Sequence, residues 1–245
     1  MERTVRSRGH RISYDDEGDG TPLVLVPGFM QWAGVWKEFG YVTPLRDAGY
    51  RTISIDPLGH GASDKPHDAA EYKRTDAAAD IVAVMDDLGI ERAALFGYSR
   101  GAGLACTAAV ECPERVSALV LGGGPTLAAG KPPAWIEPLG RGDWDEFWAA
   151  FGRIPGYEQL FEEKNDPRAL GALAEAPYRF PHALDVAALR VTPLVYGGSE
   201  DNVAGLSVVA RRAGTELQVL DGLDHGGAFL APGRVVPLVL AHLAG

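Results

Sequence analysis

Apolar runs long enough to be buried strands alternate along the chain with segments patterned as helices. The expected strands are 4–7, 21–29, 50–59, 92–99, 116–124, 191–201 and 216–225. The clearest helix lies at 76–89, where four apolar side chains share one face and Gly89 marks the end. Further helices are expected at 35–48, 100–113, 205–213 and the C-terminus. Apolar strands separated by helices predict an α/β fold, with a mostly parallel twisted sheet covered by helices on both faces.

Residues 126–182 interrupt this alternation and hold 9 of the chain's 21 aromatic residues within 57 positions. In the stretch DWDEFWAAFG, Asp143 is a predicted helix N-cap and Glu146 its capping-box partner. Four aromatic residues follow at helical spacing on one face: Trp144, Phe147, Trp148 and Phe151. This stripe is expected to anchor a helical cap to the body or to form the roof of a pocket, and both roles can hold together. We predict a core made of 1–125 and 183–245, with 126–182 as a helical cap or lid.

Unusual residues gather where the predicted strands end. Ligands of a parallel sheet bind beyond the carboxyl ends of its strands, so these loops are the place to look for a site. The loops read PGF (27–29), DPLGHG (56–61) and GYSRG (97–101), followed by the regions around Asp201 and His225. Ser99 of GYSRG lies between a strand and a helix, and its two glycine neighbours let these elements approach closely around a strained turn. Taken alone, this pentapeptide is a weak signal.

Further motifs accompany the serine in a fixed order. DPLGHGASDKP (56–66) precedes it, and PLVYGGSED (193–201) and GLDHGG (222–227) follow it. With these motifs the chain resembles the α/β-hydrolase family over residues 10–125 and 190–245, and serine, aspartate, histidine is that family's order. The family inserts its cap where residues 126–182 interrupt the sheet.

The resemblance implies that Ser99 is the nucleophile, His225 the general base and Asp201 the acid that orients the imidazole. A serine hydroxyl is a poor nucleophile at neutral pH, and it needs a base to take its proton and a third group to orient that base. The spacing within GGSED favours Asp201 over Glu200 as the acid. His60, in the DPLGHG loop, is expected to hold that loop through a hydrogen bond.

By the same resemblance, the backbone N–H groups of Phe29 and Arg100 would form an oxyanion hole. Pro27 departs from the family, which has a His-Gly pair there, so the hydrogen bonding of this loop must differ. The side chain of Arg100 has two interpretations. It turns outward to a surface carboxylate, or it is an electrostatic element of the pocket wall that pairs with a substrate carboxylate. The residues expected to bind substrate are Tyr98, Trp144, Phe147 and Trp148.

Charge and composition exclude several function classes. The chain has 33 acidic and 23 basic residues, a net charge of −10, and such a surface repels nucleic acid. Its apolar runs stop short of the ~20 residues that a membrane helix needs, and its first 18 residues lack the apolar core of a signal peptide. Cys106 and Cys112 fall on different faces of one predicted helix, so no bridge is expected between them. We expect a cytoplasmic monomer or homodimer with a small-molecule substrate, no cofactor, no metal and no membrane partner.

These observations predict a serine hydrolase that cleaves a neutral, hydrophobic carboxylic ester or lactone of small to medium size through an acyl-enzyme. Neutrality is expected because residues 126–182 carry nine acidic and six basic side chains, a net charge of −3. The same triad also serves enol-lactone or carbon–carbon bond hydrolysis and perhydrolysis of the haloperoxidase type. A non-catalytic ligand-binding protein that keeps the fold is a further alternative. Ser99 excludes the family variants that use an aspartate nucleophile.

Overall fold

The computed structural model describes residues 2–125, 127, 131–152 and 156–245. These residues form one eight-stranded sheet with the strand order β1-β2-β4-β3-β5-β6-β7-β8. The strands are β1 (Glu2–Ser7), β2 (His10–Glu17), β3 (Thr21–Val26), β4 (Tyr50–Ile55), β5 (Ala93–Tyr98), β6 (Val116–Gly122), β7 (Leu194–Gly198) and β8 (Leu217–Leu220). β1 pairs antiparallel with β2, and β2 with β4, whereas all the other pairs are parallel. The predicted α/β class with a mostly parallel sheet is confirmed.

β2 is the strand that the sequence pattern did not predict. Ile12 and Tyr14 are fully buried, but polar residues stand between and around them, so the segment has no continuous apolar run. The buried Ser13 between them donates its N–H to Ser63 Oγ at 2.8 Å. The side chains of a strand near the edge of the sheet alternate between a buried and a solvated face. A search for continuous apolar runs therefore does not detect such a strand.

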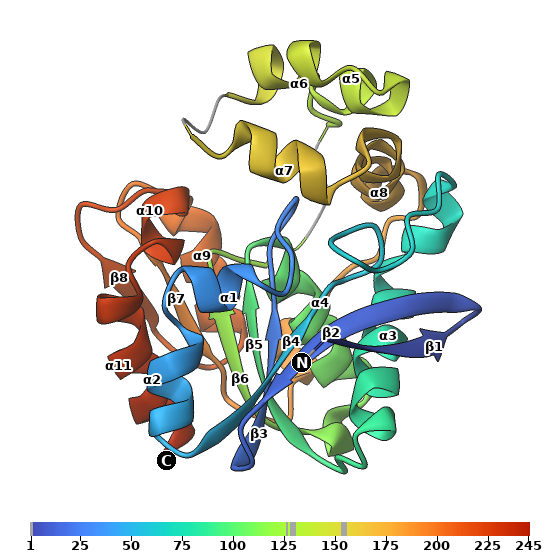
Figure 1. Cartoon of the computed structure of the whole chain (residues 1–245). Helices are drawn as coiled ribbons and strands as arrows, with labels where there is room; N and C mark the ends of the chain where they lie inside the picture. Colours follow the sequence, from blue (N-terminus) through green and yellow to red (C-terminus); the bar gives the residue numbers. More distant parts are fainter. Residues whose placement is uncertain (1, 126, 128–130, 153–155) are drawn as a thin grey trace.

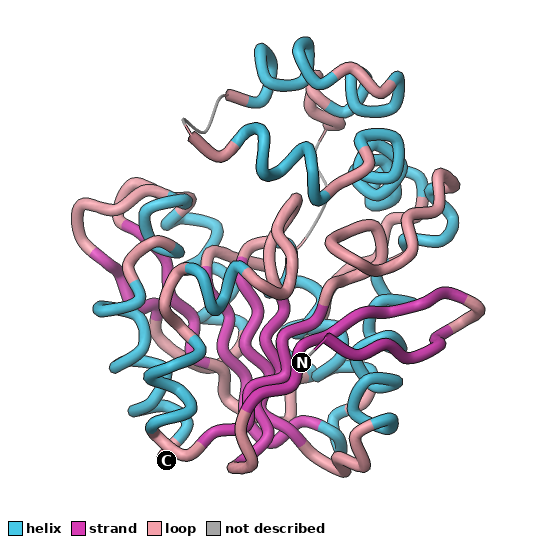
Figure 2. The backbone as a smooth tube through the Cα atoms, viewed as in Figure 1, coloured by secondary structure: helices cyan, strands magenta, loops and turns pink. Residues whose placement is uncertain are grey.

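Helices cover both faces of the sheet, as Figures 1 and 2 show. One face packs against α3 (Arg74–Asp87), α4 (Arg100–Glu111) and α9 (Val203–Arg212), and the other against α1 (Val35–Glu38), α2 (Val42–Asp47), α10 (His225–Phe229) and α11 (Pro232–Leu243). Short 3-10 helices lie at η1 (Ala69–Tyr72), η2 (Pro113–Arg115) and η3 (Val186–Ala188). The central strand β5 is buried throughout, with Leu95 in one hydrophobic cluster and Phe96 in the other. None of the helices within the described ranges is long and apolar enough to cross a membrane.

The helix expected at 35–48 is divided into two short helices. α1 ends at Glu38, and Gly40 then adopts φ +82°, a conformation that turns the chain out of the helix before α2 begins at Val42. Apolar periodicity continues across this break, which explains why the pattern predicted one helix. Cys106 lies on α4 and Cys112 directly follows its end, and both cysteines are free.

The described part of 126–182 forms a separate group of helices beyond the carboxyl ends of the strands, at the top of Figure 1. These helices are α5 (Ile136–Arg141), α6 (Trp144–Phe151), α7 (Glu158–Lys164) and α8 (Pro167–Arg179), and we call them the helical insertion. Asp143 caps α6 by accepting the N–H of Glu146 at 2.9 Å, as predicted. The second half of the predicted capping box is wrong, because the Glu146 carboxylate pairs with Arg141 and the Asp143 N–H donates to the Pro138 carbonyl.

The junction of β5 and α4 is very tightly packed. A Cβ atom on Gly97 would lie 2.3 Å from the Gly101 carbonyl oxygen, and one on Gly101 would lie 2.1 Å from the carbonyl oxygen of Val26 in β3. Only glycine at both positions allows β5 and α4 to approach this closely, as expected from the glycines on either side of Ser99. Gly103, two residues further along α4, has no such neighbour, and its nearest atom would be 3.8 Å from a Cβ.

We expect Gly101→Ala to lower the free energy of unfolding by about 1–3 kcal/mol or more, because the new methyl group overlaps a backbone carbonyl that cannot move aside. Gly103→Ala is the matched control in the same helix, and it should raise stability by about 0.4–1 kcal/mol through helix propensity and a less flexible unfolded chain. Urea unfolding of the two variants checks this difference. Equal stability of both variants would contradict the close packing described for this junction.

Candidate active site

Ser99 lies in the turn between β5 and α4, at the carboxyl edge of the sheet. Its backbone adopts φ +53° and ψ −117°, a strained conformation for a residue that carries a Cβ. Its N–H donates to the Gly122 carbonyl of β6 at 2.7 Å, and its own carbonyl accepts the N–H of Ala102 at 3.1 Å. Hydrogen bonds on both sides therefore fix the turn that presents the serine hydroxyl.

His225 and Asp201 complete a chain of hydrogen bonds that begins at Ser99. The Nε2 atom of His225 lies 2.8 Å from Ser99 Oγ, and its Nδ1 atom lies 2.8 Å from Asp201 Oδ2. A carboxylate beside Nδ1 favours the tautomer that is protonated there, which leaves Nε2 free to accept the serine proton. Asp201 follows β7, His225 opens α10, and the Asp201 side chain is only 10% exposed. Glu200, the alternative acid, has an exposed side chain.

Tyr98 hydrogen-bonds to the backbone of His225 and lies beside its ring. Its hydroxyl donates to the His225 backbone carbonyl at 2.5 Å, and the two rings lie 5.5 Å apart. The side chain is 2% exposed, and burial raises the pKa of its phenol well above the usual value. Tyr98 was expected to bind substrate, and this role stays a prediction for a side chain that is buried and hydrogen-bonded to the His225 backbone.

Two backbone N–H groups beside Ser99 have the arrangement expected of an oxyanion hole. The loop after β3 passes so close that a Cβ on Gly28 would lie 3.3 Å from Ser99 Cβ. The next residue is Phe29, and Arg100 opens α4 directly after Ser99. Among the described residues, no acceptor takes a hydrogen bond from the N–H of Phe29 or of Arg100. A helix N-terminus adds the positive end of its dipole to such a pair of donors.

Gln31 holds the loop after β3 in place and was not singled out by the sequence. Its side-chain oxygen accepts the Gly28 N–H at 2.7 Å, and its backbone N–H donates to the Gly28 carbonyl at 3.3 Å. The loop was expected to use different hydrogen bonds from the family because of Pro27, and these are the bonds that it makes. The signal in the sequence would have been a side-chain acceptor three residues after Gly28.

The helical insertion rests directly on this loop. Met30 is buried in one cluster with insertion residues, and Phe29 and Trp32 pack against the same cluster. Met30 adopts φ +65°, an unfavourable conformation for its side chain, and its carbonyl accepts a hydrogen bond of 2.8 Å from Asn165 Nδ2. Asn165 is buried and also donates to the Phe161 carbonyl at 2.9 Å. Sequence reasoning missed Asn165, whose partner in the loop is 135 residues away.

The aromatic stripe of α6 mainly forms the interior of the insertion. Phe147 is 0% exposed and Trp148 2%, and the indole N–H of Trp148 donates to Glu162 at 2.7 Å. Trp144 packs against the same cluster. The expectation that these three side chains contact substrate stays a prediction, and of the three Phe147 and Trp148 are buried inside the insertion whereas Trp144 is partly exposed. The rings that face Phe29 are Trp135, with ring centroids 5.3 Å apart, and Phe151, at 6.3 Å.

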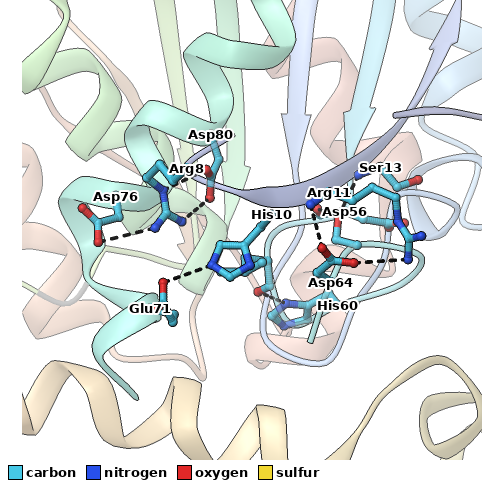
Figure 3. Close-up of polar contacts among 12 residues, drawn as sticks. Arg8, His10, Arg11, Ser13, Asp56, His60, Asp64, Glu71, Asp76 and Asp80 are labelled. Atoms are coloured by element: carbon cyan, nitrogen blue, oxygen red, sulfur yellow. Dashed lines mark hydrogen bonds and ion pairs between the residues drawn. The ribbon is translucent and has the colours of Figure 1, made fainter. Parts of the chain in front are cut away.

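The DPLGHGASDKP segment is a structural loop, part of which is drawn in Figure 3. The Asp56 carboxylate accepts the N–H groups of Ala33 at 2.5 Å and Ala62 at 2.8 Å, and burial raises the pKa of this carboxyl. A Cβ on Gly61 would lie 2.3 Å from the same carboxylate, so glycine is required there. His60 is fully buried, and its Nδ1 atom lies 3.3 Å from the Leu58 carbonyl. His60 therefore has the loop-holding contact that was expected of it.

The side chain of Arg100 is turned into the protein. Its Nη1 atom is buried and has no hydrogen-bond partner in the described part of the chain. Burial and the charge of Arg74 lower the pKa of Arg100 to about 10. The interpretation in which Arg100 turns outward to a surface carboxylate is therefore wrong.

Cavities and side-chain clusters elsewhere do not compete with this site. A cavity of about 610 Å³ lies beside Asp56, Lys65 and Asp166, and its described lining includes no member of the Ser99–His225–Asp201 chain. In the described ranges, no group of three or more His, Cys, Asp or Glu side chains is placed to hold a metal ion. The hydrogen-bonded chain at the sheet edge is the chemically competent arrangement.

Comparison with known proteins matches residues 21–152 to the model of the alpha/beta hydrolase fold family. The chain is 38% identical over 121 residues to 2-hydroxymuconate semialdehyde hydrolase of Pseudomonas sp. strain CF600, a match that covers 49% of this chain and 42% of that protein. It is 33% identical over 151 residues to haloalkane dehalogenase of Mycolicibacterium paratuberculosis, covering 60% of this chain and 46% of that protein. The matched region thus spans about half the length of these curated relatives.

Solved structures match the whole chain at lower sequence identity. An esterase from Exiguobacterium antarcticum superposes with a TM-score of 0.84 at 23% identity, covering 100% of both chains. The enol-lactonase from Burkholderia xenovorans LB400 superposes with a TM-score of 0.79 at 19% identity, covering 99% of this chain and 98% of that one. At these identities the likeness establishes the fold.

We expect Asn165→Ala to loosen the loop after β3, because it removes the side-chain amide that donates to the carbonyl groups of Met30 and Phe161. The free energy of unfolding should fall by about 1–3 kcal/mol, and backbone amides at 28–34 should exchange faster in hydrogen–deuterium exchange. Gln159→Ala is the control, since its amide bonds only to the exposed Glu163, and it should change stability by less than about 0.5 kcal/mol. Unchanged exchange at 28–34 in Asn165→Ala would show that the loop does not depend on the insertion.

Proposed function

The chain belongs to the alpha/beta-hydrolase fold family, and we propose that within it the chain is a serine hydrolase of a carboxylic ester or lactone. The observation that carries this proposal is the pair of 2.8 Å contacts that join Ser99 Oγ to His225 and His225 to Asp201. The curated relatives include a semialdehyde hydrolase and a haloalkane dehalogenase, so relationship alone selects no substrate.

In the proposed reaction, Ser99 Oγ attacks the substrate carbonyl carbon while His225 Nε2 takes the hydroxyl proton. The negative charge that develops on the carbonyl oxygen is stabilised by the N–H groups of Phe29 and Arg100. As the tetrahedral intermediate collapses, the carbon–oxygen bond to the alcohol breaks and the imidazolium returns its proton to that alcohol. Water then attacks the acyl-enzyme by the same route and releases the carboxylic acid. Asp201 holds the imidazole in the required tautomer and stabilises the imidazolium.

The residues around the reaction centre favour a substrate with an apolar group of small to medium size. Phe29 lies against Trp135 and Phe151, and Phe151 is the one of these three that is most exposed, at 38%. Aromatic rings of this kind bind apolar or ring-bearing acyl and alcohol groups. The acidic insertion, with its net charge of −3, disfavours anions at long range, and the resulting preference for a neutral substrate stays a prediction.

Hydrolysis of a carbon–carbon bond is the second candidate. It is favoured by the 38% identity with 2-hydroxymuconate semialdehyde hydrolase over residues that amount to half of this chain. The same serine, base and oxyanion donors would serve it. A substrate panel that includes neutral esters, lactones and a dienol ketone decides between the two reactions by comparing kcat/KM.

Ser99→Ala should abolish covalent labelling by a fluorophosphonate probe and lower ester turnover by at least about 10⁴-fold, because the nucleophile acts as one unit with its base. Ser207→Ala, a substitution in α9, serves as the control and should label and turn over like the unaltered protein. Near-native turnover by Ser99→Ala would overturn the mechanism. Failure of the unaltered protein to label would favour the non-catalytic binding protein.

Asp201→Asn should lower kcat by about 10²–10⁴-fold, since the amide leaves the imidazole in the wrong tautomer. Glu200→Gln removes the adjacent carboxylate, whose exposed side chain lies outside the hydrogen-bonded chain, and it should change kcat less than about twofold. Steady-state kinetics of the two variants on one ester make the comparison. A larger decrease of kcat in Glu200→Gln than in Asp201→Asn would show that Glu200, and not Asp201, orients the imidazole.

A further inference from the structure

Two arginines occupy the first positions of two neighbouring helices. Arg74 opens α3 and Arg100 opens α4, and the two helices bury their side chains in one hydrophobic cluster. A cation at the N-terminus of a helix opposes the helix dipole, whereas an anion there is stabilised by it. Both arginines therefore stand where the backbone itself favours negative charge.

One guanidinium nitrogen of each arginine is buried without a hydrogen-bond partner among the described residues. In both Arg74 and Arg100 this nitrogen is Nη1. Arg74 lies against the first turn of α4, since its Cζ and Nε would be 3.9 Å from a Cβ on Gly103. The charge of Arg74 adds to burial in lowering the pKa of Arg100 to about 10, so Arg100 is still charged at neutral pH. Two buried like charges beside each other are costly unless an anion accompanies them.

Asp80 and Glu71 line one small cavity with Arg100, and their carboxylates are bound to Arg8 and His10, as Figure 3 shows. Arg8 forms two hydrogen bonds to Asp80, at 2.9 and 3.1 Å, and an ion pair with Asp76 at 3.6 Å. His10 lies 3.0 Å from Glu71. Within the ranges that the structure describes, no carboxylate lies within 4.0 Å of a nitrogen of Arg74 or Arg100. Arg8 and His10 thus each have a carboxylate partner, whereas Arg74 and Arg100 have none among the described residues.

The pair borders the reaction centre. Arg100 follows Ser99 directly, and its charge acts on the fully buried His60, whose ring lies 6.4 Å from that of Phe29. His60 Nε2 is a third buried polar atom without a partner. Unsatisfied buried groups are rare in folded proteins, and each one calls for a ligand, a water or a catalytic role. Three of the seven such atoms among the described residues belong to Arg74, Arg100 and His60.

We propose that the guanidinium groups of Arg74 and Arg100 form an anion subsite beside Ser99, and that this subsite binds a carboxylate carried by the substrate. This proposal rests on the proposed serine hydrolase function. A planar carboxylate matches the donor geometry of guanidinium groups, and a monoanion is repelled less than a phosphate dianion by a chain of net charge −10. The expected substrate is then an ester or lactone with an apolar body and an acidic end. The short-range charges of the two arginines thus outweigh the long-range argument for a neutral substrate.

Kinetics on matched esters test the subsite. The p-nitrophenyl monoester of glutaric acid and p-nitrophenyl pentanoate have acyl chains of equal length, and the first ends in a carboxylate. The unaltered protein should prefer the carboxylate ester in kcat/KM by about 10- to 100-fold, the range of a hydrogen bond to a charged group. Arg74→Met should lose this preference, measured as the ratio of kcat/KM on the two esters in the same variant, and Arg74→Lys should keep part of it. Arg100→Met is judged by the same ratio, with its own pentanoate rate as reference.

Arg141→Gln is the matched control, because Arg141 is exposed on the insertion and pairs with Glu137 and Glu146. It should leave the ratio of the two esters unchanged. A preference for the pentanoate in the unaltered protein, or an undiminished carboxylate preference in Arg74→Met, would overturn the proposal.

A binding measurement separates the failure of this subsite from failure of the hydrolase function. In the Ser99→Ala protein, phenylacetate should raise Tm by several degrees at saturation, and the neutral phenylacetamide should not. Arg74→Met in the same background should abolish this rise and, without any anion, should be at least as stable as its parent, because a buried unpaired charge has been removed. If Ser99 proves unreactive but phenylacetate still stabilises, the hydrolase proposal fails and carboxylate binding stands. No stabilisation by phenylacetate, or an equal rise with inorganic phosphate or chloride, would overturn the substrate subsite.

Discussion

The contact between β3, β5 and the first turn of α4 is the constraint on which the rest of this molecule depends. The backbones at Gly97 and Gly101 touch where any side chain would overlap a carbonyl group. This contact forces Ser99 into its left-handed conformation, aims the N-terminus of α4 at the sheet edge and brings the loop after β3 beside the serine. The placement of Ser99, the proposed nucleophile, and of the N–H groups of Phe29 and Arg100, the proposed oxyanion donors, follows from this one backbone approach.

The helical insertion adds a second layer of support to the same loop. Met30, with its unfavourable φ, is held by Asn165 through a hydrogen bond and by the aromatic interior of the insertion through packing. Preorganised donors lower a reaction barrier because no reorganisation is needed when charge develops. The contacts of the insertion with Met30 therefore help to hold the loop that carries the Phe29 N–H, which is a proposed oxyanion donor.

The sequence was sufficient to predict the α/β class, seven of the eight described strands and most helices, but not β2, whose polar positions interrupt the apolar run. Strand-end positions in a parallel sheet converge, and the resemblance to the α/β-hydrolase family selected Ser99, Asp201 and His225 among them. Tyr98 and Asn165 gave no comparable signal for their hydrogen bonds, which reach residues 127 and 135 positions away in the sequence. An aromatic stripe identifies which face of a helix is buried and not what it is buried against, which is why both an anchoring role and a place in the pocket were expected for α6.

Arg100 illustrates the same limit for a charged residue. An arginine at a helix start is ordinarily solvated, and the sequence around it contains no hint of the opposite outcome. The packing of α3 against α4 places Arg74 beside Gly103 of α4, and the charge of Arg74 acts on Arg100. The electrostatics of this site arise from a tertiary contact between two helix ends.

The connection of the insertion to the core has a consequence for how such a molecule diversifies. The insertion leaves after β6 and returns before β7, so a different set of helices fits there without altering strand order or the turn at Ser99. The insertion contacts Met30, however, so each replacement also changes the contacts that hold the loop carrying the proposed oxyanion donor Phe29. Exchange of this segment would therefore change the substrate range and the intrinsic reactivity together. The two properties would then evolve as one trait.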